Sequence, residues 1–454
     1  MKLLDTLSKK LAGLMSDLNF DVIPGKVIEK TKVSILDHIA CAYAGSHLDW
    51  SRAALELVQE FGAREESTVW ISGFKTTVPY TAFVNSVLSN SVIHEDQHLN
   101  SGSHPGTMVI PVAFAMGEKY NSTGKEILAA IIAGYETIAR LAKVISAEEM
   151  SKRGFRPTSV FGPFGAAVTA GKLMGLNQDE MVRALGAAGS FAAGVNEWAP
   201  AGTDDFYFQT ANASYNGILS AYLARKGIRF APSIVEGVAG MSRAFTGIAQ
   251  AGDYVFEDFQ QKFEMLDVYH KPVPGCAMIQ TTAQIALEIA NTGIDYRDIK
   301  EGAIKTSFMG KYYPGCDSVG PFTGMTQARM SNQYTFAAVL YKKELSNNIY
   351  EIYDNEEIYT LAQKLRVEVD EEANKLFPGK QMVKVNLVLN NGSNRDFIKK
   401  DLDHYTDSRS AVINKFKSYS SKLIDDQRID SILNVINDFA GLASISKLIS
   451  LMNV

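Results

Sequence analysis

The stretch TGKEILAAIIAGYETIARLAKVI, residues 123–145, is apolar on most sides of a helix and predicts a long buried one. Its start carries a capping signal. Ser122 and Thr123 are good N-cap residues, and Glu126, three positions past Thr123, completes a capping box. A helix that is apolar nearly all round must be enclosed by other elements. This stretch therefore places a helical core in the first half of the chain.

The segments around it continue the helical pattern. KVIEKTKVSILDHIACAYAG (residues 26–45) repeats apolar residues every three to four positions and ends on a glycine, which is typical of an amphipathic helix and its stop. Residues 161–176 and 181–194 are rich in glycine and alanine, whose small side chains let neighbouring helices approach closely. We therefore predict a large helical domain over residues 1–265, with these two segments crossing in its core.

The pattern changes near residue 266. KTSFMGKYY (305–313), KLRVEVD (364–370) and VKVNLVLNNGSNRDFI (383–398) are short and rich in β-branched or aromatic residues, and the last alternates before an Asn-Gly turn, as hairpins do. Helical stretches at 278–293 and 327–345 lie between them. The predicted fold is thus mainly α with a second α+β domain: an α+β lid over 266–403 and a helical tail, 404–454, that returns to the first domain.

Composition narrows the function classes. The chain has 454 residues, 46% hydrophobic and 21% charged, and a formal net charge of -5, so no basic surface argues for nucleic acid or an anionic membrane. Its three cysteines form neither a disulfide framework nor a zinc pattern, which favours a reducing, cytoplasmic setting. We expect no membrane span, because no run of about 18 apolar residues occurs. The N-terminus predicts a first helix rather than a signal peptide.

A cluster of titratable residues lies within NSVIHEDQHLNSGSHPGTMVIPVAFA, residues 90–115. It brings His94, Glu95, Asp96, His98 and His104 into eleven positions. An acidic group beside an imidazole suits general acid–base chemistry near neutral pH. The i, i+4 pair of histidines would also fit a metal site, but no further ligand cluster accompanies it. We favour acid–base catalysis and predict no metal, with a solvated loop as the remaining alternative.

Arg156 is the second candidate. It stands before the helix start PTSVFGPFGAA, residues 157–167, where a guanidinium and a helix N-terminus together can bind a carboxylate. A structural arginine that caps a neighbouring helix explains the position equally well. We predict a substrate-binding role.

Three further segments carry reactive or aromatic residues. NEWAPAGTDDFYFQTANASYNG (196–217) holds Phe206 within an aromatic group that would form a pocket wall or simply core. YHKPVPGCAMIQTTAQ (269–284) places Lys271 before a turn and a helix start, and its cysteine more often packs as an apolar residue than acts as a nucleophile. KYYPGCDSVGPFTGMTQARMS (311–331) offers Tyr312 and Tyr313 as an acid or base.

In this order the segments resemble the MmgE/PrpD family, which includes 2-methylcitrate dehydratase, cis-aconitate decarboxylase and iminodisuccinate epimerase. The resemblance spans nearly the whole chain. It implies a helical domain built from both chain ends, an α+β lid, a cleft between them, a homodimer, and catalysis without metal or organic cofactor. The matching motifs are LDHIACAYAG (36–45), EDQH (95–98), SHPG (103–106), GFRPTSVFGPFGAAVTAGKLMGL (154–176), NGILSAYLARKGI (216–228) and KPVPGCAMIQ (271–280).

Carried over by residue, the resemblance implies catalytic roles for His104, Asp96 and a pocket tyrosine, which we assign to Tyr312. It also exposes departures. Arg156 stands where decarboxylase and dehydratase members place a histidine, Phe206 stands close to the place of a lysine, and Gln280 near that of a histidine. The loss of a lysine and two histidines removes proton donors and cations. Arg156 restores only one fixed positive charge, and an arginine with a pKa above 12 cannot replace an ordinary acid or base.

These departures change the expected substrate. Either it carries fewer carboxylates than a citrate, or His98, His270 and Lys271 supply the missing charge. We therefore predict a lyase that takes a proton from carbon in a small carboxylate, with Arg156, Lys271, Gln280, His98 and Phe206 as substrate-binding residues. The alternatives are an epimerase, isomerase or cyclase acting on an imino acid or a less polar biosynthetic intermediate, and a non-catalytic binding relative.

Overall fold

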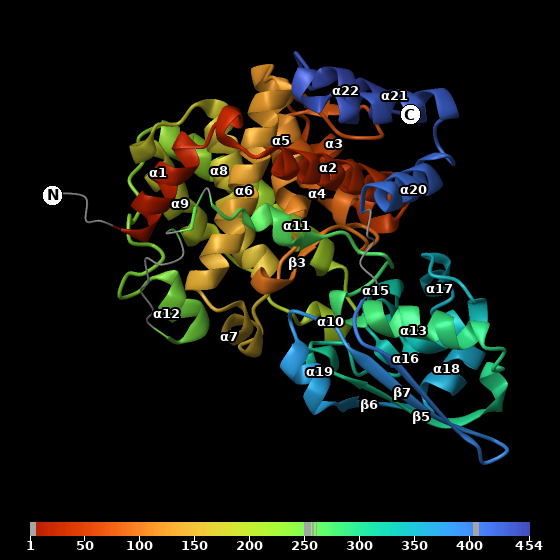
Figure 1. The fold of residues 1–454 in the computed structure, drawn as a ribbon. Coiled ribbons are helices and arrows are strands. Elements are labelled where there is room, and N and C mark those ends of the chain that lie inside the picture. Colours follow the sequence, from red (N-terminus) through yellow and green to blue (C-terminus); the bar gives the residue numbers. More distant parts are fainter. Residues whose placement is uncertain (1–5, 249–255, 257, 260, 403–407) are drawn as a thin grey trace.

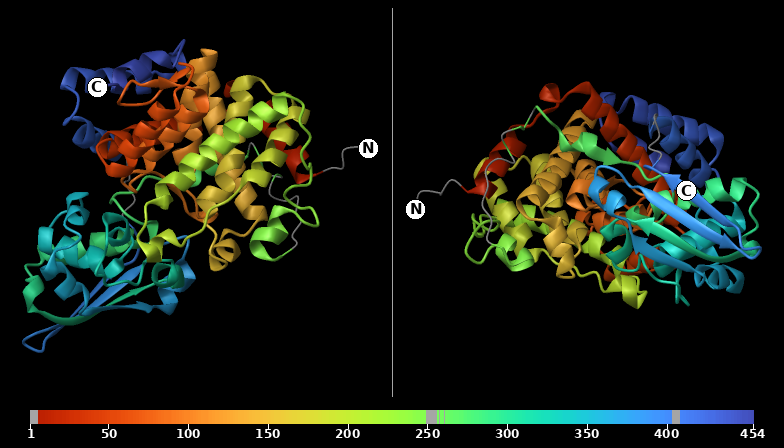
Figure 2. Two further views of the ribbon diagram at one scale, coloured as in Figure 1. Left: turned by 180° about the vertical axis from the view of Figure 1, so that it is seen from behind. Right: turned by 60° about the horizontal axis from the view of Figure 1, so that its bottom comes forward.

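The structure is a computed structural model, and it describes residues 6–248, 256, 258–259, 261–402 and 408–454. A large helical domain and a smaller α+β domain lie side by side (Figure 1). Seen from behind, the sheet of the α+β domain lies at the end of the molecule away from the helical domain (Figure 2, left). The predicted fold class, mainly α with a second α+β domain, is confirmed.

The helical domain is built from both ends of the chain. Helix α20 (Ser408–Ser420) packs on α2 (Gly25–Gly45), where the Lys415 ammonium donates to the Asp37 carboxylate at 2.7 Å. The Tyr43 hydroxyl donates to the carbonyl of Met452 in the last helix at 2.8 Å. The main helices of this domain are α1 (Leu7–Asp17), α2 (Gly25–Gly45), α3 (Asp49–Phe61), α4 (Val78–Asn90), α5 (Gly106–Tyr120), α6 (Gly124–Val144), α7 (Ala147–Lys152), α8 (Pro157–Met174), α9 (Gln178–Phe191), α10 (Trp198–Ala201), α11 (Asp205–Arg225), α12 (Met241–Thr246), α20 (Ser408–Ser420), α21 (Asp426–Asn437) and α22 (Ser446–Met452).

Helix α6 lies in the core as predicted, and Thr123 and Glu126 form the expected capping box. Small residues set the spacing between the central helices. A Cβ built on Gly217 of α11 would lie 2.2 Å from the Cβ of Ala166 on α8, so only glycine permits this crossing. The predicted close packing of the two glycine- and alanine-rich segments is confirmed, because a Cβ built on Gly171 of α8 would lie 2.9 Å from Met181 Cε of α9.

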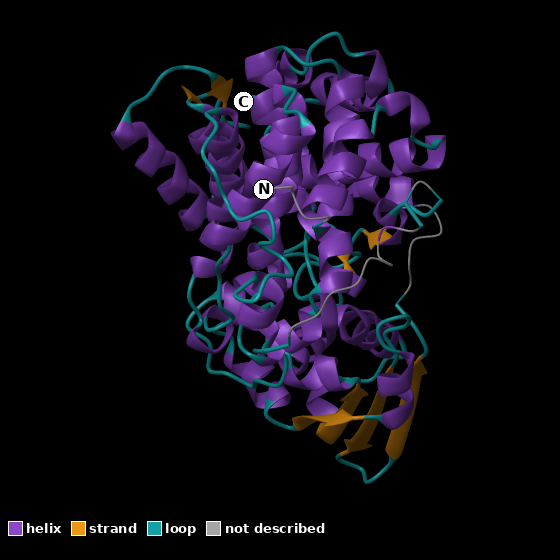
Figure 3. Ribbon diagram, turned by 90° about the vertical axis from the view of Figure 1, so that its left-hand side faces the viewer, coloured by secondary structure: helices purple, strands orange, loops and turns teal. Residues whose placement is uncertain are grey.

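The α+β domain holds a four-stranded sheet in the order β6-β5-β7-β8. Strands β5 and β6 are parallel and the other neighbours antiparallel. Figure 3 shows these strands gathered at one end of the molecule. The elements of this domain are α13 (Gln280–Asn291), β5 (Ile299–Thr306), α14 (Phe308–Tyr312), α15 (Met325–Ala328), α16 (Asn332–Lys342), α17 (Asn348–Glu351), α18 (Glu356–Ala362), β6 (Leu365–Val369), α19 (Glu371–Leu376), β7 (Val383–Leu389) and β8 (Asn394–Lys399).

The hairpin β7–β8 forms where the alternating pattern predicted it, and every second residue of β7 is buried. The expectation of a strand over 305–313 is wrong for most of that segment. Strand β5 ends at Thr306, and the Ser307 hydroxyl then accepts from the Gly310 amide at 3.0 Å, which starts α14 instead. Tyr312 is the last residue of this short helix.

The segment that joins the domains is tied to the histidine-rich loop. Strands β3 (Gln97–His98) and β4 (Val268–Tyr269) pair antiparallel. The predicted boundary at 265–266 lies just before β4 and stays a prediction, while the one at 403–404 lies outside the described residues. Among the helices of the described ranges, none has the length and apolar character needed to cross a bilayer.

Candidate active site

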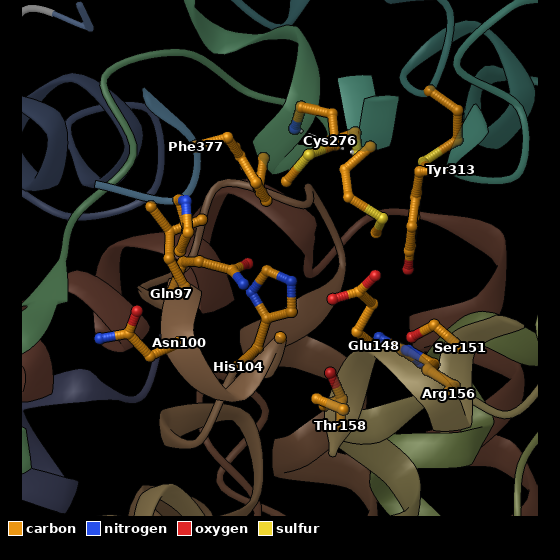
Figure 4. Close-up of a pocket in the computed structure, with 18 of the residues that line it drawn as sticks. Gln97, Asn100, His104, Glu148, Ser151, Arg156, Thr158, Cys276, Tyr313 and Phe377 are labelled. Atoms are coloured by element: carbon orange, nitrogen blue, oxygen red, sulfur yellow. Dashed lines mark hydrogen bonds between the residues drawn. The ribbon is translucent and has the colours of Figure 1, made fainter. Parts of the chain in front are cut away.

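A cavity of about 430 Å³ lies between the two domains, within the range of roughly 300–1,000 Å³ typical of small-molecule sites. Figure 4 shows side chains converging on it from both sides. The helical domain contributes Ile93, Gln97, Leu99, Asn100, Gly102, His104, Ala147, Glu148, Ser151, Arg156, Thr158, Trp198 and Phe206, which we call the floor. The α+β side, from residue 276 on, contributes Cys276, Ala277, Met278, Phe308, Met309, Tyr313, Met330, Asn374, Phe377 and Pro378, which we call the roof.

His104 stands on the floor, two residues before α5. Its Nδ1 lies 2.8 Å from the backbone carbonyl oxygen of Asp96. A carbonyl only accepts hydrogen bonds, so Nδ1 carries the proton and donates it. The other nitrogen, Nε2, then holds a free lone pair, and the ring points among the labelled pocket side chains (Figure 4). This is the tautomer that a general base requires.

The charge state of His104 follows from its surroundings. Burial, and then the positive charges of Lys271 and Arg156, hold the pKa of its imidazole well below the ordinary value of 6.5. The imidazole is therefore neutral at physiological pH and ready to accept a proton.

This low pKa predicts the pH dependence of any proton abstraction by His104. A base works only when unprotonated, so the acid limb of the kcat–pH profile should lie below pH 6.5. Lys271→Met removes a cation that lowers this pKa, and the acid limb should move to higher pH. Lys271→Arg keeps the charge and should leave the limb near its original place. An acid limb that is identical in Lys271→Met and wild type would refute the assignment of His104 as the titrating base.

Glu95 and Lys271 form a fully buried ion pair next to His104. Glu95 Oε1 is 3.3 Å from His104 Nδ1 and 3.5 Å from Lys271 Nζ. Lys271 also donates to the carbonyl of Ile93 at 3.0 Å. Neither side chain is part of the cavity wall. Lys271 therefore acts on a substrate only through His104 and the loop that bears it.

Asp96 is also buried away from the cavity. Its carboxylate lies 3.1 Å from His38 Nε2 and accepts from the Tyr135 hydroxyl at 2.5 Å. Burial alone would raise the pKa of Asp96, but the charge and hydrogen bonds of His38 and Tyr135 hold it below its ordinary value. The backbone of Asp96 faces His104 while its side chain anchors the loop to α2 and α6. It is a positioning residue in this geometry.

Gly106 gives a direct test of this anchor. A Cβ at Gly106 would lie 2.0 Å from His38 Nε2 and 2.3 Å from the Tyr135 hydroxyl, so neither ring could keep its place. Overpacking of this kind lowers the free energy of unfolding by about 1–3 kcal/mol. We expect Gly106→Ala to lower Tm by several degrees in thermal unfolding. Gly25→Ala, where the added Cβ meets nothing within 4 Å, is the matched control and should leave Tm nearly unchanged.

Arg156 is the N-cap of α8 and is fully enclosed. Its Nη1 donates to the carbonyl of Phe206 at 2.6 Å, and its guanidinium stacks 3.7 Å above the Phe206 ring centre. Among the described residues, none forms a hydrogen bond with its Nη2. Burial lowers the pKa of Arg156 to about 10, so it stays cationic at neutral pH. A buried donor of this kind is ready for an anionic ligand.

The two candidate tyrosines differ in position relative to the cavity. The Tyr312 side chain is 59% exposed at the end of α14 and does not line the cavity, which corrects our choice between the pair. Tyr313 lines the roof, where burial and the nearby Cys276 raise the pKa of its hydroxyl although Arg156 opposes the rise. The hydroxyl is thus protonated at neutral pH and available as a hydrogen-bond donor.

Of the other predicted substrate-binding residues, one lines the cavity and two do not. Phe206 lines the cavity beneath Arg156. Gln280 does not, because its amide donates to the Val273 carbonyl at 2.9 Å and accepts from the Val273 amide at 3.1 Å, which holds the junction turn. His98 lies off the cavity, with Nδ1 2.9 Å from the Ser101 hydroxyl and Nε2 3.6 Å from Glu264.

One group of the described residues has the spacing of a metal site. Ligand atoms of His98, Glu264 and Asp267 lie within 4.8 Å of one another. The Lys143 ammonium already contacts the Glu264 carboxylate at 2.5 Å and neutralises it. These residues thus form a network of ion pairs, and none of them lines the cavity.

Several lining residues were not predicted from the sequence. Gln97 and Asn100 lie in the same loop as His104, and Glu148 and Ser151 lie on α7 a few positions before Arg156, so proximity along the chain was a usable signal. Asn374 on α19 and Phe377 just after it reach the cavity from the α+β domain (Figure 4 labels Phe377). No pattern in the sequence marks these last two.

The sequence comparisons agree with this architecture. Residues 9–252 match the MmgE/PrpD N-terminal domain and residues 273–438 match the MmgE/PrpD C-terminal domain. The chain belongs to the MmgE/PrpD family, as the motifs predicted.

Its relatives include named decarboxylases. The chain is similar to cis-aconitate decarboxylase of Aspergillus terreus, with 27% identity over 479 residues that cover 98% of this chain and 96% of that protein. It is 28% identical over 228 residues to the cis-aconitate decarboxylase-like protein oryM of Aspergillus oryzae, covering 49% and 47% of the two chains. Human cis-aconitate decarboxylase is 26% identical over 293 residues, covering 63% and 60%.

Proposed function

We propose that this protein is a lyase that removes a proton from carbon next to a carboxylate, using only its own side chains. One observation carries the proposal. A neutral imidazole with a free Nε2 and a buried guanidinium with an unpartnered Nη2 line the same cavity. The first is a base and the second is an anion-binding group, which is the pair that such a reaction needs.

The roles follow from the charges. Arg156 binds the substrate carboxylate and stabilises the enolate-like negative charge that develops when the neighbouring carbon loses its proton. His104 Nε2 takes that proton and becomes an imidazolium. Tyr313, whose hydroxyl stays protonated, donates to the leaving oxygen where water is lost. A decarboxylation would run without that abstraction: the bond to carbon dioxide breaks, its electron pair stays on carbon, and the carbanion takes one proton from the Tyr313 hydroxyl, which solvent then restores.

The named relatives favour elimination or decarboxylation over isomerisation, because those matched here are cis-aconitate decarboxylases or like them. An epimerase would use the same base and need a second proton donor on the opposite face of the carbon. A purely binding relative would not need a neutral imidazole held in one tautomer. The homodimer and the cytoplasmic setting stay predictions from the sequence.

A product screen tests the reaction class. Purified enzyme is incubated with hydroxy, unsaturated and keto carboxylic acids, and products are followed by mass spectrometry and chiral chromatography. A mass loss of water or carbon dioxide supports the lyase. Conversion to a stereoisomer at constant mass would replace it with the isomerase. Binding of several acids with turnover of none would favour the non-catalytic relative.

A further inference from the structure

The cavity has two chemically different faces. Its floor carries polar groups, among them Gln97, His104 and Arg156. Its roof is mainly apolar, and Tyr313 and Asn374 are its polar side chains with oxygen or nitrogen. Three methionines, Met278, Met309 and Met330, contribute to the roof, and methionine adapts its shape to varied apolar ligands.

The charges of the lining are few. Arg156 is the one lysine or arginine among the described lining residues, and Glu148 is the one carboxylate. The Glu148 carboxylate pairs with Lys152 at 2.9 Å, outside the lining. A second carboxylate on the substrate would thus enter a cavity whose lining offers no second cation. Burying an unpaired charge is strongly unfavourable.

Arg156 itself has room for one anion. Its Nη1 is already bonded to the Phe206 carbonyl, and one face of its guanidinium rests on the Phe206 ring. The unpartnered Nη2 remains for the ligand.

We infer that the substrate is a monocarboxylic acid with an apolar chain, whose carboxylate binds Arg156 on the floor and whose chain packs against the methionine-lined roof. This inference rests on the proposed function, since it names the substrate class of the same site. Such a substrate differs from cis-aconitate, the tricarboxylate in the relatives' names, because the lining holds only one cationic side chain, Arg156.

A matched pair of ligands tests it. 3-Hydroxyhexanoate and 3-hydroxyhexanedioate have the same length and differ only in a terminal methyl or carboxylate. We expect the monoacid to bind wild-type protein about 100-fold more tightly or better by isothermal titration calorimetry, because the second carboxylate finds no cation. Equal binding, or tighter binding of the diacid or of cis-aconitate, would overturn the inference.

A charge added to the roof should change this preference. Met309 is half-buried in the lining, so a lysine there can reach the cavity or water. Met309→Lys should strengthen diacid binding relative to monoacid binding by about tenfold or more, and Met309→Leu should not. An unchanged ratio in the lysine variant would contradict the placement of the chain against the roof.

Binding and turnover separate the two proposals. If the monoacid binds preferentially but no acid exchanges a carbon-bound proton or reacts, the proposed function fails while the specificity of the site stands. If diacids and tricarboxylates bind better and react, the proposed function stands and the monocarboxylate inference is wrong.

Discussion

His104→Gln is expected to lower kcat by roughly 10²–10⁴-fold, the usual contribution of a general base. Glutamine can keep the hydrogen bond to the Asp96 carbonyl that His104 makes at 2.8 Å, but its amide cannot accept a proton at neutral pH. The loop should therefore remain in place while the base is lost. Steady-state kinetics with the substrate found in the product screen measures the effect, and KM should change little.

The matched control for this variant is His47→Gln. His47 is exposed and lies outside the cavity lining, so its replacement should leave kcat within about twofold of wild type. Equal Tm values for the two variants would exclude unfolding as the cause of lost activity. Retention of wild-type kcat by His104→Gln would rule out His104 as the base.

Arg156→Lys should reduce kcat/KM by roughly 30-fold to several thousand-fold, which corresponds to the 2–5 kcal/mol associated with truncating one partner of a buried charge pair. A lysine keeps the charge but lacks both the planar fork and the stacking on Phe206 that occurs here at 3.7 Å. The carboxylate would be held less firmly and the developing charge stabilised less. Both KM and kcat should suffer.

Arg153→Lys is the neighbouring control for Arg156→Lys. Arg153 is exposed, and its Nη1 donates to the Ala244 carbonyl at 3.0 Å, away from the cavity lining. We expect its kcat/KM to stay within about twofold of wild type. If the two lysine variants behaved alike, Arg156 would not be the carboxylate ligand.

Local patterns predicted much of the fold because the physics behind them is local. The capping box of Thr123 and Glu126 and the alternation along Val383–Leu389 each depend on neighbours within a few residues, and both appear as predicted. The prediction of a strand over 305–313 was wrong because two local preferences compete there. Its aromatic residues favoured a strand, but the Ser307 cap starts a helix, which overrides that preference.

The site was harder to predict because it depends on which way side chains point. Tyr312 and Tyr313 are adjacent and chemically equal, yet one is exposed and the other lines the cavity. The Gln280 side-chain amide could bind a substrate, but it forms hydrogen bonds with the backbone of the turn at Val273. Asn374 reaches the cavity from the α+β domain, and only the packing of the two domains places it there.

Proton abstraction from carbon by His104 is the step on which the proposed function depends. Incubation of the enzyme and its substrate in D₂O, followed by NMR of the recovered substrate and product, tests it most directly. We expect wild-type enzyme to introduce deuterium at the carbon next to the carboxylate, and His104→Gln to introduce almost none. Deuterium incorporation at the same rate by both proteins would contradict it.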